Sequence, residues 1–363
     1  MKTRTQYSAL LSSLLLITAC SDEPSPQQAS WEIIQEAPIQ GREGHSVVWT
    51  GDEVIVWGGR AGDELADGAA YDPHADTWRT IATPSGFTSR YGHTAVWTGE
   101  EMLVTQGRNA AGAESDGMLY SPDSDTWRAA AAAPDITDTV DHFAFDGGAV
   151  VLSEDAVHQY DADADDWSWT ETGFPVVDGA LMASGQVAFV GIDEGRSLSF
   201  GAADPVSGEY QRLPSQGIQE GPWDRAALVA SEQNELWLVS ARSESDRTYL
   251  HSLREGDEAW TLEYEDESQY LQASEGLGNP ADTVLLIWDQ GDLVSVRAGA
   301  IGIFDTETST LSTYQADNDV APCLLGGYTV LADTQLVSWS GPSCRSDAPL
   351  SYPAEGLSVE LPN

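Results

Sequence analysis

An internal repeat constrains the fold of this chain more than any other feature. One unit covers residues 41–78, and its copy covers residues 90–127. The equivalent tryptophans of the two units, Trp78 and Trp127, lie 49 residues apart. Repeats of this length each form one small structural unit, and the units must stack to bury their apolar faces. The sequence therefore predicts an array of similar units that pack side by side.

An aromatic pair with a spacing of seven residues marks the later part of each unit. The clear pairs are Tyr71 and Trp78, Tyr120 and Trp127, and Tyr160 and Trp167. Weaker copies continue the spacing at Ala203 and Tyr210, Leu253 and Trp260, Phe304 and Leu311, and Tyr352 and Val359. The later members of these pairs recur about every 47 residues, which predicts seven units.

The local composition of the units indicates β-strands. Short runs rich in β-branched and aromatic residues, such as residues 53–57 and 235–239, are separated by Gly, Asp and Pro turns. The chain contains 34 glycines and 17 prolines, and no long stretch spaces its apolar residues as a helix would. An all-β fold follows.

The repeat units resemble the kelch repeat. The residues that carry the resemblance are His45, Gly58, Gly59, Tyr71 and Trp78, then His93, Gly107, Tyr120 and Trp127, and in a third, altered unit His142, Tyr160 and Trp167. The resemblance implies a single kelch-type β-propeller over residues 31–363, with seven blades or, as the alternative, six. It also implies that these histidines are structural and do not form a metal site.

The N-terminal strand is expected to close the ring. Trp31 lies 47 residues before Trp78, so residues 31–34 are interpreted as the outermost strand of the last blade. Residues 357–361 compete for the same place.

The N-terminus is interpreted as an export signal over residues 1–19. Lys2 and Arg4 precede a short apolar run over residues 9–17, which is too short for a permanent membrane span. The following Ile-Thr-Ala-Cys resembles the lipobox of bacterial lipoproteins, which implies lipidation of Cys20 and anchoring to a membrane of the cell envelope. The alternative is a secretory peptide cut before Cys20. Ser21 favours the outer membrane, with the orientation toward the periplasm or the surface left open.

A polar segment and two cysteines complete the expected organisation. Residues 20–30 contain almost no apolar side chains and are predicted to form a flexible tether. Cys323 and Cys344 remain as a pair in an oxidising compartment, and a disulfide between them is predicted. The alternative, a two-cysteine metal site, lacks further ligands at suitable spacing.

The formal net charge of −43 makes nucleic acid an unsuitable partner. A saline habitat, where salt screens the repulsion, is one interpretation of this charge. Asp161, Asp163 and Asp165 alternate as the ligands at the start of a calcium loop do, but Thr172 stands where such a loop has a bidentate glutamate. These residues also coincide with a blade turn, so calcium is a weak candidate and no cofactor is otherwise expected.

The sequence contains no recognisable catalytic motif. Kelch propellers include galactose oxidase, whose cysteine cross-link has no spare thiol here, and sialic acid epimerases, whose catalytic residues match no motif of this chain. We expect a monomeric, non-enzymatic binding scaffold for a protein or glycan partner. The alternative is a carbohydrate-active enzyme such as an epimerase-like mutarotase, and a third is a calcium-stiffened lectin. An enzyme predicts carboxylates with shifted pKa values, whereas a scaffold predicts exposed aromatic residues.

Overall fold

The structure is a computed structural model that describes residues 27–136, 139–145, 147–242, 247–266, 285–289, 292–297, 300–316, 329–340 and 356–361. Within these ranges the chain forms β-strands and turns, and they contain no helix. In particular, none of the described residues belongs to a helix long and apolar enough to cross a membrane.

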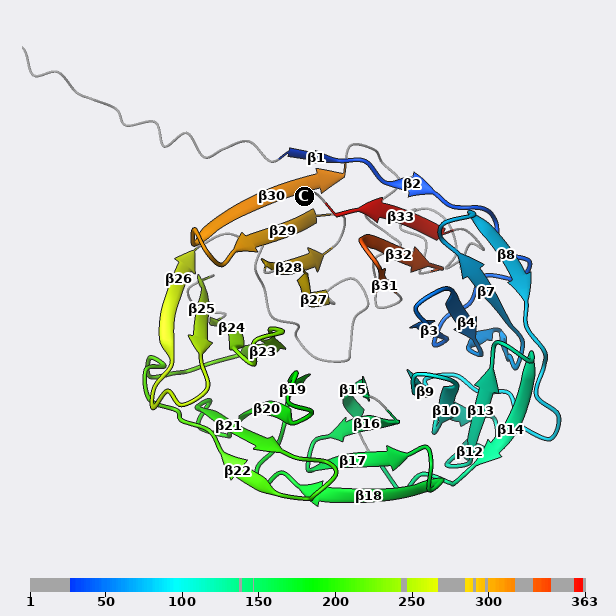
Figure 1. Ribbon diagram of the computed structural model, residues 1–363, viewed down its shortest axis with the longest axis horizontal. Helices are drawn as coiled ribbons and strands as arrows, with labels where there is room; N and C mark the ends of the chain where they lie inside the picture. The colour runs from blue at the N-terminus through cyan, green and yellow to red at the C-terminus, as the bar shows by residue number, and fades with distance from the viewer. Residues whose placement is uncertain are drawn as a thin grey trace, which may run out of the picture.

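The strands form a ring of small sheets, the blades of a β-propeller (Figure 1). The strands β3, β9, β15, β19, β23, β27 and β31 lie nearest the centre of the ring (Figure 1). From them each blade proceeds outward through antiparallel neighbours to the rim. The all-β propeller predicted from the repeat is confirmed.

The first three blades follow the clear repeat units. Their strands are β3 (Ser46–Trp49), β4 (Val54–Trp57), β7 (Gly68–Asp72) and β8 (Thr77–Thr80); β9 (Thr94–Trp97), β10 (Met102–Thr105), β13 (Gly117–Ser121) and β14 (Thr126–Ala130); and β15 (Thr139–Phe145), β16 (Gly148–Ser153), β17 (Ala156–Asp161) and β18 (Asp166–Glu171). Two small hairpins project from the first two blades, β5 (Arg60–Ala61) with β6 (Asp63–Glu64) and β11 (Arg108–Asn109) with β12 (Gly112–Ala113).

The fourth and fifth blades have the same strand order without the clear motif. They consist of β19 (Asp178–Leu181), β20 (Val187–Ile192), β21 (Leu198–Ala203) and β22 (Tyr210–Arg212), followed by β23 (Arg225–Ala230), β24 (Leu236–Arg242), β25 (Arg247–Leu253) and β26 (Thr261–Asp266).

The remaining sheets close the ring. One contains β27 (Leu285–Asp289), β28 (Asp292–Arg297), β29 (Ala300–Asp305) and β30 (Thr310–Ala316), with β1 (Gln27–Ala29) added in parallel to β30. The other contains β31 (Thr329–Ala332), β32 (Gln335–Trp339) and β33 (Gly356–Glu360), with β2 (Glu32–Ile33) at the rim. Within the described ranges, six sheets of the ring are therefore regular four-stranded blades, and six is the blade number of the alternative prediction. The five-stranded sheet occupies the place of the remaining predicted unit.

The N-terminal strand completes the last blade, as predicted. Glu32 and Ile33 on β2 pair antiparallel with Ser358 and Leu357 on β33. Trp31 is buried and packs with the core residues of this junction. Residues 357–361 do not displace the N-terminal strand, because β33 is the third strand of the blade.

Two sequence predictions differ from the structure at this closure. The last seven-residue pair was placed at Tyr352 and Val359, but Val359 lies on the third strand, opposite Leu336 of β32. Tyr352 lies outside the described residues. The N-terminus supplies the outer strand of this blade, so Trp31 takes the rim position there. Similarly, Gln27–Ala29 falls within the predicted tether but pairs with β30, so only residues up to 26 precede the first strand.

The seven-residue spacing corresponds to a cross-strand pair between the third and fourth strands. Tyr71 lies opposite Trp78, and the pairs that begin at residues 120, 160, 203 and 304 follow the same register. A hairpin with a short turn places residues seven apart directly opposite each other.

Apolar side chains alternate between the two faces of each blade and pack against both neighbours. On β4, Val54 and Val56 pack toward the last blade and its Trp339, whereas Ile55 and Trp57 pack toward the second blade. The core therefore consists of layers between blades, and no blade can bury its faces alone.

A hydrogen-bond network that we call the inter-blade clamp joins the first blade to the last. The Tyr71 hydroxyl donates to Asp76 Oδ1 at 2.9 Å, and the same oxygen accepts the Gln35 N–H at 3.0 Å. The Trp78 indole Nε1 donates to the Gln35 carbonyl at 2.8 Å. Both backbone groups of one residue in the preceding connection are thereby satisfied.

The clamp recurs in the second and third blades. Its members are Tyr120, Asp125 and Trp127 acting on Ala82, with distances of 2.8, 2.7 and 2.6 Å, and Tyr160, Asp165 and Trp167 acting on Ala131, with distances of 2.7, 2.7 and 3.2 Å. Each clamp aspartate has a φ between 48° and 50°, a conformation that Asp and Asn tolerate better than most residues. Burial and the adjacent carboxylate raise the pKa of Tyr120 to about 12, so its hydroxyl remains a donor.

Candidate functional site

The arginines that precede the repeat histidines hold the fold together. The Arg42 side chain is fully buried, and its Nη1 donates to the Gly58 carbonyl at 3.1 Å and to Asp67 Oδ1 at 2.7 Å. Arg90 makes the equivalent contacts in the second blade, to the Gln106 carbonyl at 2.8 Å and to Asp116 at 2.6 Å. These guanidinium groups are not available to a ligand.

The repeat histidines His45 and His93 bind the preceding blade. His45 Nε2 lies 3.2 Å from the Trp339 carbonyl, and His93 Nε2 lies 3.0 Å from Ser46 Oγ. Burial lowers the pKa of each imidazole to about 3, so both rings are neutral near pH 7. In the third unit the equivalent His142 is exposed.

The glycines of the motif make room for the same histidines. A Cβ on Gly58 would lie 2.6 Å from the His93 ring, and one on Gly107 would lie 2.8 Å from His93 Cβ. Gly59 has a positive φ and lies against the Glu43 carbonyl, which a Cβ would approach to 2.7 Å. Backbone packing thus explains why these positions carry glycine.

The candidate calcium ligands are engaged in the third blade turn. Asp161 Oδ1 accepts the N–H groups of Asp163 and Ala164, both at 2.9 Å, and Asp165 belongs to the clamp. Asp163 is exposed. Across the described residues, no group of three or more His, Cys, Asp or Glu side chains is arranged to hold a metal ion.

Cys20, Cys323 and Cys344 lie outside the described residues. The lipidation of Cys20 and the predicted disulfide between the other two therefore stay predictions.

Two carboxylates on innermost strands form one candidate site. Asp141 is on β15 and Asp178 is on β19, in neighbouring blades. Burial raises the pKa of Asp141 to about 7. Burial and the charge of Asp141 raise the pKa of Asp178, although its Oδ2 accepts the Leu228 N–H at 2.6 Å. A carboxyl group that titrates near neutral pH can donate or accept a proton.

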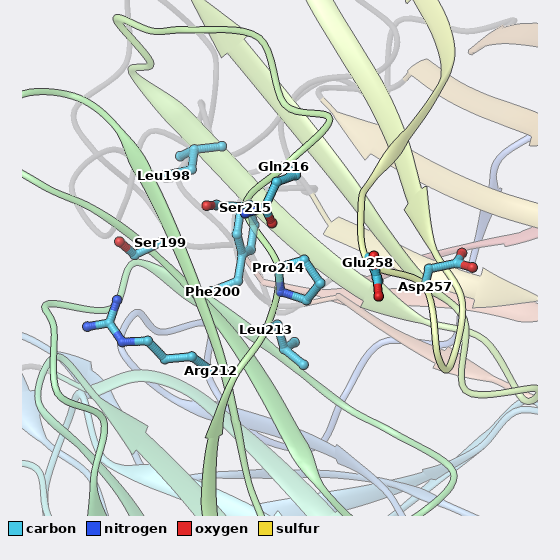
Figure 2. Close-up of a pocket in the computed structure, with 10 residues that line it drawn as sticks. All are labelled: Leu198, Ser199, Phe200, Arg212, Leu213, Pro214, Ser215, Gln216, Asp257 and Glu258. Atoms are coloured by element: carbon cyan, nitrogen blue, oxygen red, sulfur yellow. The ribbon is translucent and has the colours of Figure 1, made fainter.

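A second candidate site is an open pocket of about 450 Å³ between the fourth and fifth blades (Figure 2). On one side, Arg212 is the last residue of β22, the outer strand of the fourth blade, and its guanidinium lies over the Phe174 ring, with Cζ 5.6 Å from the ring centre. On the other side, Asp257 and Glu258 project from the turn between β25 and β26. Figure 2 shows the arginine and the two acids on opposite sides of Phe200 and Pro214.

Neither candidate site was predicted from the sequence. Asp141 and Asp178 occupy no position that recurs in the repeat units. The chain contains 59 acidic residues, so the sequence does not distinguish these two carboxylates from the others. The pocket residues come from two blades in which the motif has changed. Comparison with protein-family models and with curated proteins finds no match for this chain, so the assignment depends on the geometry.

Proposed function

We propose that this protein is a lipid-anchored, non-enzymatic binding protein of the cell envelope, in which a kelch-type propeller presents its loops to a protein or glycan partner. The observation that carries this proposal is the engagement of the repeat residues. The arginines bind groups of their own blades, whereas the histidines bind the preceding blade and the clamp aspartates bind the connection that precedes their own blade. A rigid ring whose motif residues serve its own assembly is suited to presenting loops.

Exposed apolar side chains on the outer strands of the third and fourth blades support a binding role. Trp169 on β18 exposes 62% of its surface, and Val206 in the turn before β22 exposes 76%. Tyr210 on β22 exposes 37%. Large exposed apolar residues are common at contact surfaces, where an aromatic ring contributes a large contact area.

The ligand class is tested by thermal unfolding of the mature protein with a panel of monosaccharides, including sialic acid, with and without calcium. A ligand at about 100 times its Kd stabilises the fold by about 2.7 kcal/mol. A shift with an unmodified sugar supports a glycan-binding protein. Conversion of any sugar during the incubation contradicts a non-enzymatic role. A shift with calcium alone supports the weak site at Asp161, Asp163 and Asp165.

The anchor is tested separately by metabolic labelling with a radioactive fatty acid. The wild-type chain is expected to incorporate the label and to fractionate with the outer membrane. Cys20→Ser removes the acylated thiol and is expected to abolish labelling. Labelling of the variant would place the lipid elsewhere and contradict the proposed anchor. Thiol titration of unfolded protein with and without reductant tests the disulfide between Cys323 and Cys344.

One observation favours a second function, acid–base catalysis on a sugar: the raised pKa of Asp141 and Asp178. The folded pKa of Asp141 exceeds its ordinary value of 3.8, so its protonated form stabilises the fold below that value and loses this contribution as the pH rises through about 7. Asp141→Asn is therefore expected to stabilise the fold above pH 7, by about 1 kcal/mol. If the variant also abolishes a measured sugar conversion, the catalytic role is supported.

A further inference from the structure

The fourth strands of the blades lie at the rim, and they differ in how their outer edges are protected (Figure 1). Proteins protect such edges with charged side chains or by keeping the strand short. Charged residues occur within β8, β14 and β26, where they are Arg79, Arg128, and Glu263 with Glu265. The strands β2 and β22 are only two and three residues long. Two longer strands, β18 and β30, have no charged residue between their ends.

The outer edge of β30 is covered by another strand. β1 lies in parallel along β30, with Gln27 opposite Tyr314 and Ala29 opposite Ala316. The added segment comes from outside the repeat units and is itself uncharged. An uncharged fourth strand of this ring therefore accepts an added strand.

The edge of β18 is similar, but within the described ranges β18 pairs only with β17. The N–H of Thr172, directly after β18, donates to the carbonyl of Asp155, directly before β17, at 2.9 Å. Residues of an antiparallel strand alternate between facing the neighbouring strand and facing away from it. The backbone groups of Trp169 and Glu171 therefore point away from β17, toward the rim. They are available to pair with a further strand.

An exposed tryptophan lies beside this edge. Trp169 exposes 62% of its surface. It is the second residue after the clamp residue Trp167, and the first two blades have Thr80 and Ala129 at this position. The repeat therefore does not require a large side chain here. Aromatic residues stabilise facing pairs across neighbouring strands, so the Trp169 ring can cover an apolar side chain of an added strand.

The two ends of β18 determine which charge an added strand should have. Asp166 and Glu171 are exposed carboxylates at these ends. Antiparallel pairing of β18 with a second copy of itself would place Asp166 opposite Glu171 at both ends, and facing like charges are destabilising. A segment with arginine or lysine at its ends would instead meet these carboxylates favourably. The formal net charge of −43 adds long-range attraction for a basic partner.

We infer that the outer edge of β18 binds an extended segment of a partner protein as an added strand, and that this segment has basic residues on either side of an uncharged centre. The inference rests on the proposed binding function and names a surface and a partner chemistry for it. The backbone of the segment pairs with Trp169 and Glu171, and a central side chain packs on the Trp169 ring. In this mode the main-chain hydrogen bonds give affinity and the side chains give specificity.

The test is fluorescence anisotropy of a labelled peptide, Arg-Thr-Val-Thr-Val-Arg blocked at both ends, titrated with the full mature protein in detergent. We expect a Kd below about 100 µM. The same peptide with glutamate in place of both arginines should bind at least about ten-fold more weakly. Equal binding of the two peptides, or no binding of the arginine peptide up to about 1 mM, overturns the inference.

Backbone pairing is tested by methylating alternate amide nitrogens of the peptide. An added strand turns every second N–H toward β18, so methylation of the two valine amides and methylation of the two threonine amides affect opposite edges. One of these peptides should lose affinity at least about ten-fold, and the other should bind as the parent does. An equal effect of the two methylations, whether small or large, contradicts an added strand.

Variants assign the peptide to β18. Ser168→Arg places a charge where β8 and β14 have Arg79 and Arg128, and it is expected to weaken binding of the arginine peptide at least about ten-fold. Ala164→Arg, which adds the same charge in the exposed turn before β18, is the matched control and should change the affinity less than about three-fold. Trp169→Thr should weaken binding at least about five-fold through loss of the ring. Unchanged affinity in both β18 variants contradicts the assignment.

The outcome is separable from that of the proposed function. A sugar that shifts the unfolding curve while the arginine peptide does not bind leaves the binding function in place and overturns the strand site. Self-association that Ser168→Arg abolishes, without peptide binding, would identify β18 as an interface between two copies and contradict a basic partner.

Discussion

The first three blades and the fifth blade solve the same packing problem with different side chains. In the first three, a tyrosine, an aspartate and a tryptophan hold both backbone groups of one residue in the preceding connection. In the fifth, Trp260 binds the Pro214 carbonyl by its indole and the Gln216 carbonyl by its backbone N–H at 2.8 Å. The hydrogen bonds of the tryptophan therefore suffice to join a blade to the preceding connection, and the residues at the tyrosine and aspartate positions can then change.

The largest expected effect concerns Gly217, whose backbone lies in close contact with the Trp260 backbone in the fifth blade. Its φ is +89°, and an added Cβ would overlap the Trp260 backbone. Gly217→Ala is expected to destabilise the fold by about 4 kcal/mol, from left-handed strain and overpacking together. Gly256→Ala is the control, with a φ of +88° and open space, and should cost about 1 kcal/mol. Equal midpoints in urea unfolding would show that the contact at Gly217 is not tight.

The next effect compares two arginines. Arg90→Met leaves the partly buried carbonyls of Gln106 and Asp116 without their donor and should cost about 3 kcal/mol. Arg212→Met, in the fourth blade, removes no protein hydrogen bond and should change stability by less than about 0.5 kcal/mol. Denaturant unfolding of both variants measures the difference. A large loss for Arg212→Met would mean that the contact of its side chain with the Phe174 ring stabilises the fold.

The next prediction concerns the clamp aspartate, which lies five residues after the clamp tyrosine. Asp125→Ala removes the acceptor for the Tyr120 hydroxyl and for the Ala82 N–H, and should cost about 2 kcal/mol. Glu258→Ala alters the same repeat position in the fifth blade and should cost less than about 0.5 kcal/mol. Thermal unfolding of the two variants measures the contrast. Similar losses would indicate that Glu258 retains a structural role.

The smallest effect depends on pH and concerns His93 in the second blade. Its folded pKa of about 3 lies below the ordinary value of 6.5, so the neutral ring stabilises the fold above 6.5. That contribution is lost progressively as the pH falls from 6.5 toward 3. The stability advantage of wild type over His93→Gln should therefore shrink by about 1–2 kcal/mol between about pH 7.5 and pH 4.5. A constant difference across this range would mean that the imidazole protonates in the folded protein.

The repeat predicted the fold class, the cross-strand pairs and the closure, because these depend on local spacing that a hairpin turns into direct contact. Tyr71 opposite Trp78 and the rim position of Trp31 both follow from counting residues. The prediction was wrong for Val359, because its spacing to Tyr352 imitated a hairpin in a blade whose outer strand comes from the other end of the chain.

The sequence by itself therefore determined a ring of β-sheet blades with aromatic pairs at their junctions, since short-range periodicity governs which side chains face each other across a hairpin. Only the tertiary structure decided which polar groups remain free. Arg90 and Arg212 look alike in a sequence, but one is enclosed by carbonyl groups of its own blade and the other is exposed, with its guanidinium over the Phe174 ring. Burial and hydrogen-bond partners come from residues far apart in the chain, and they alone separate a residue that holds the fold from one that can bind a ligand.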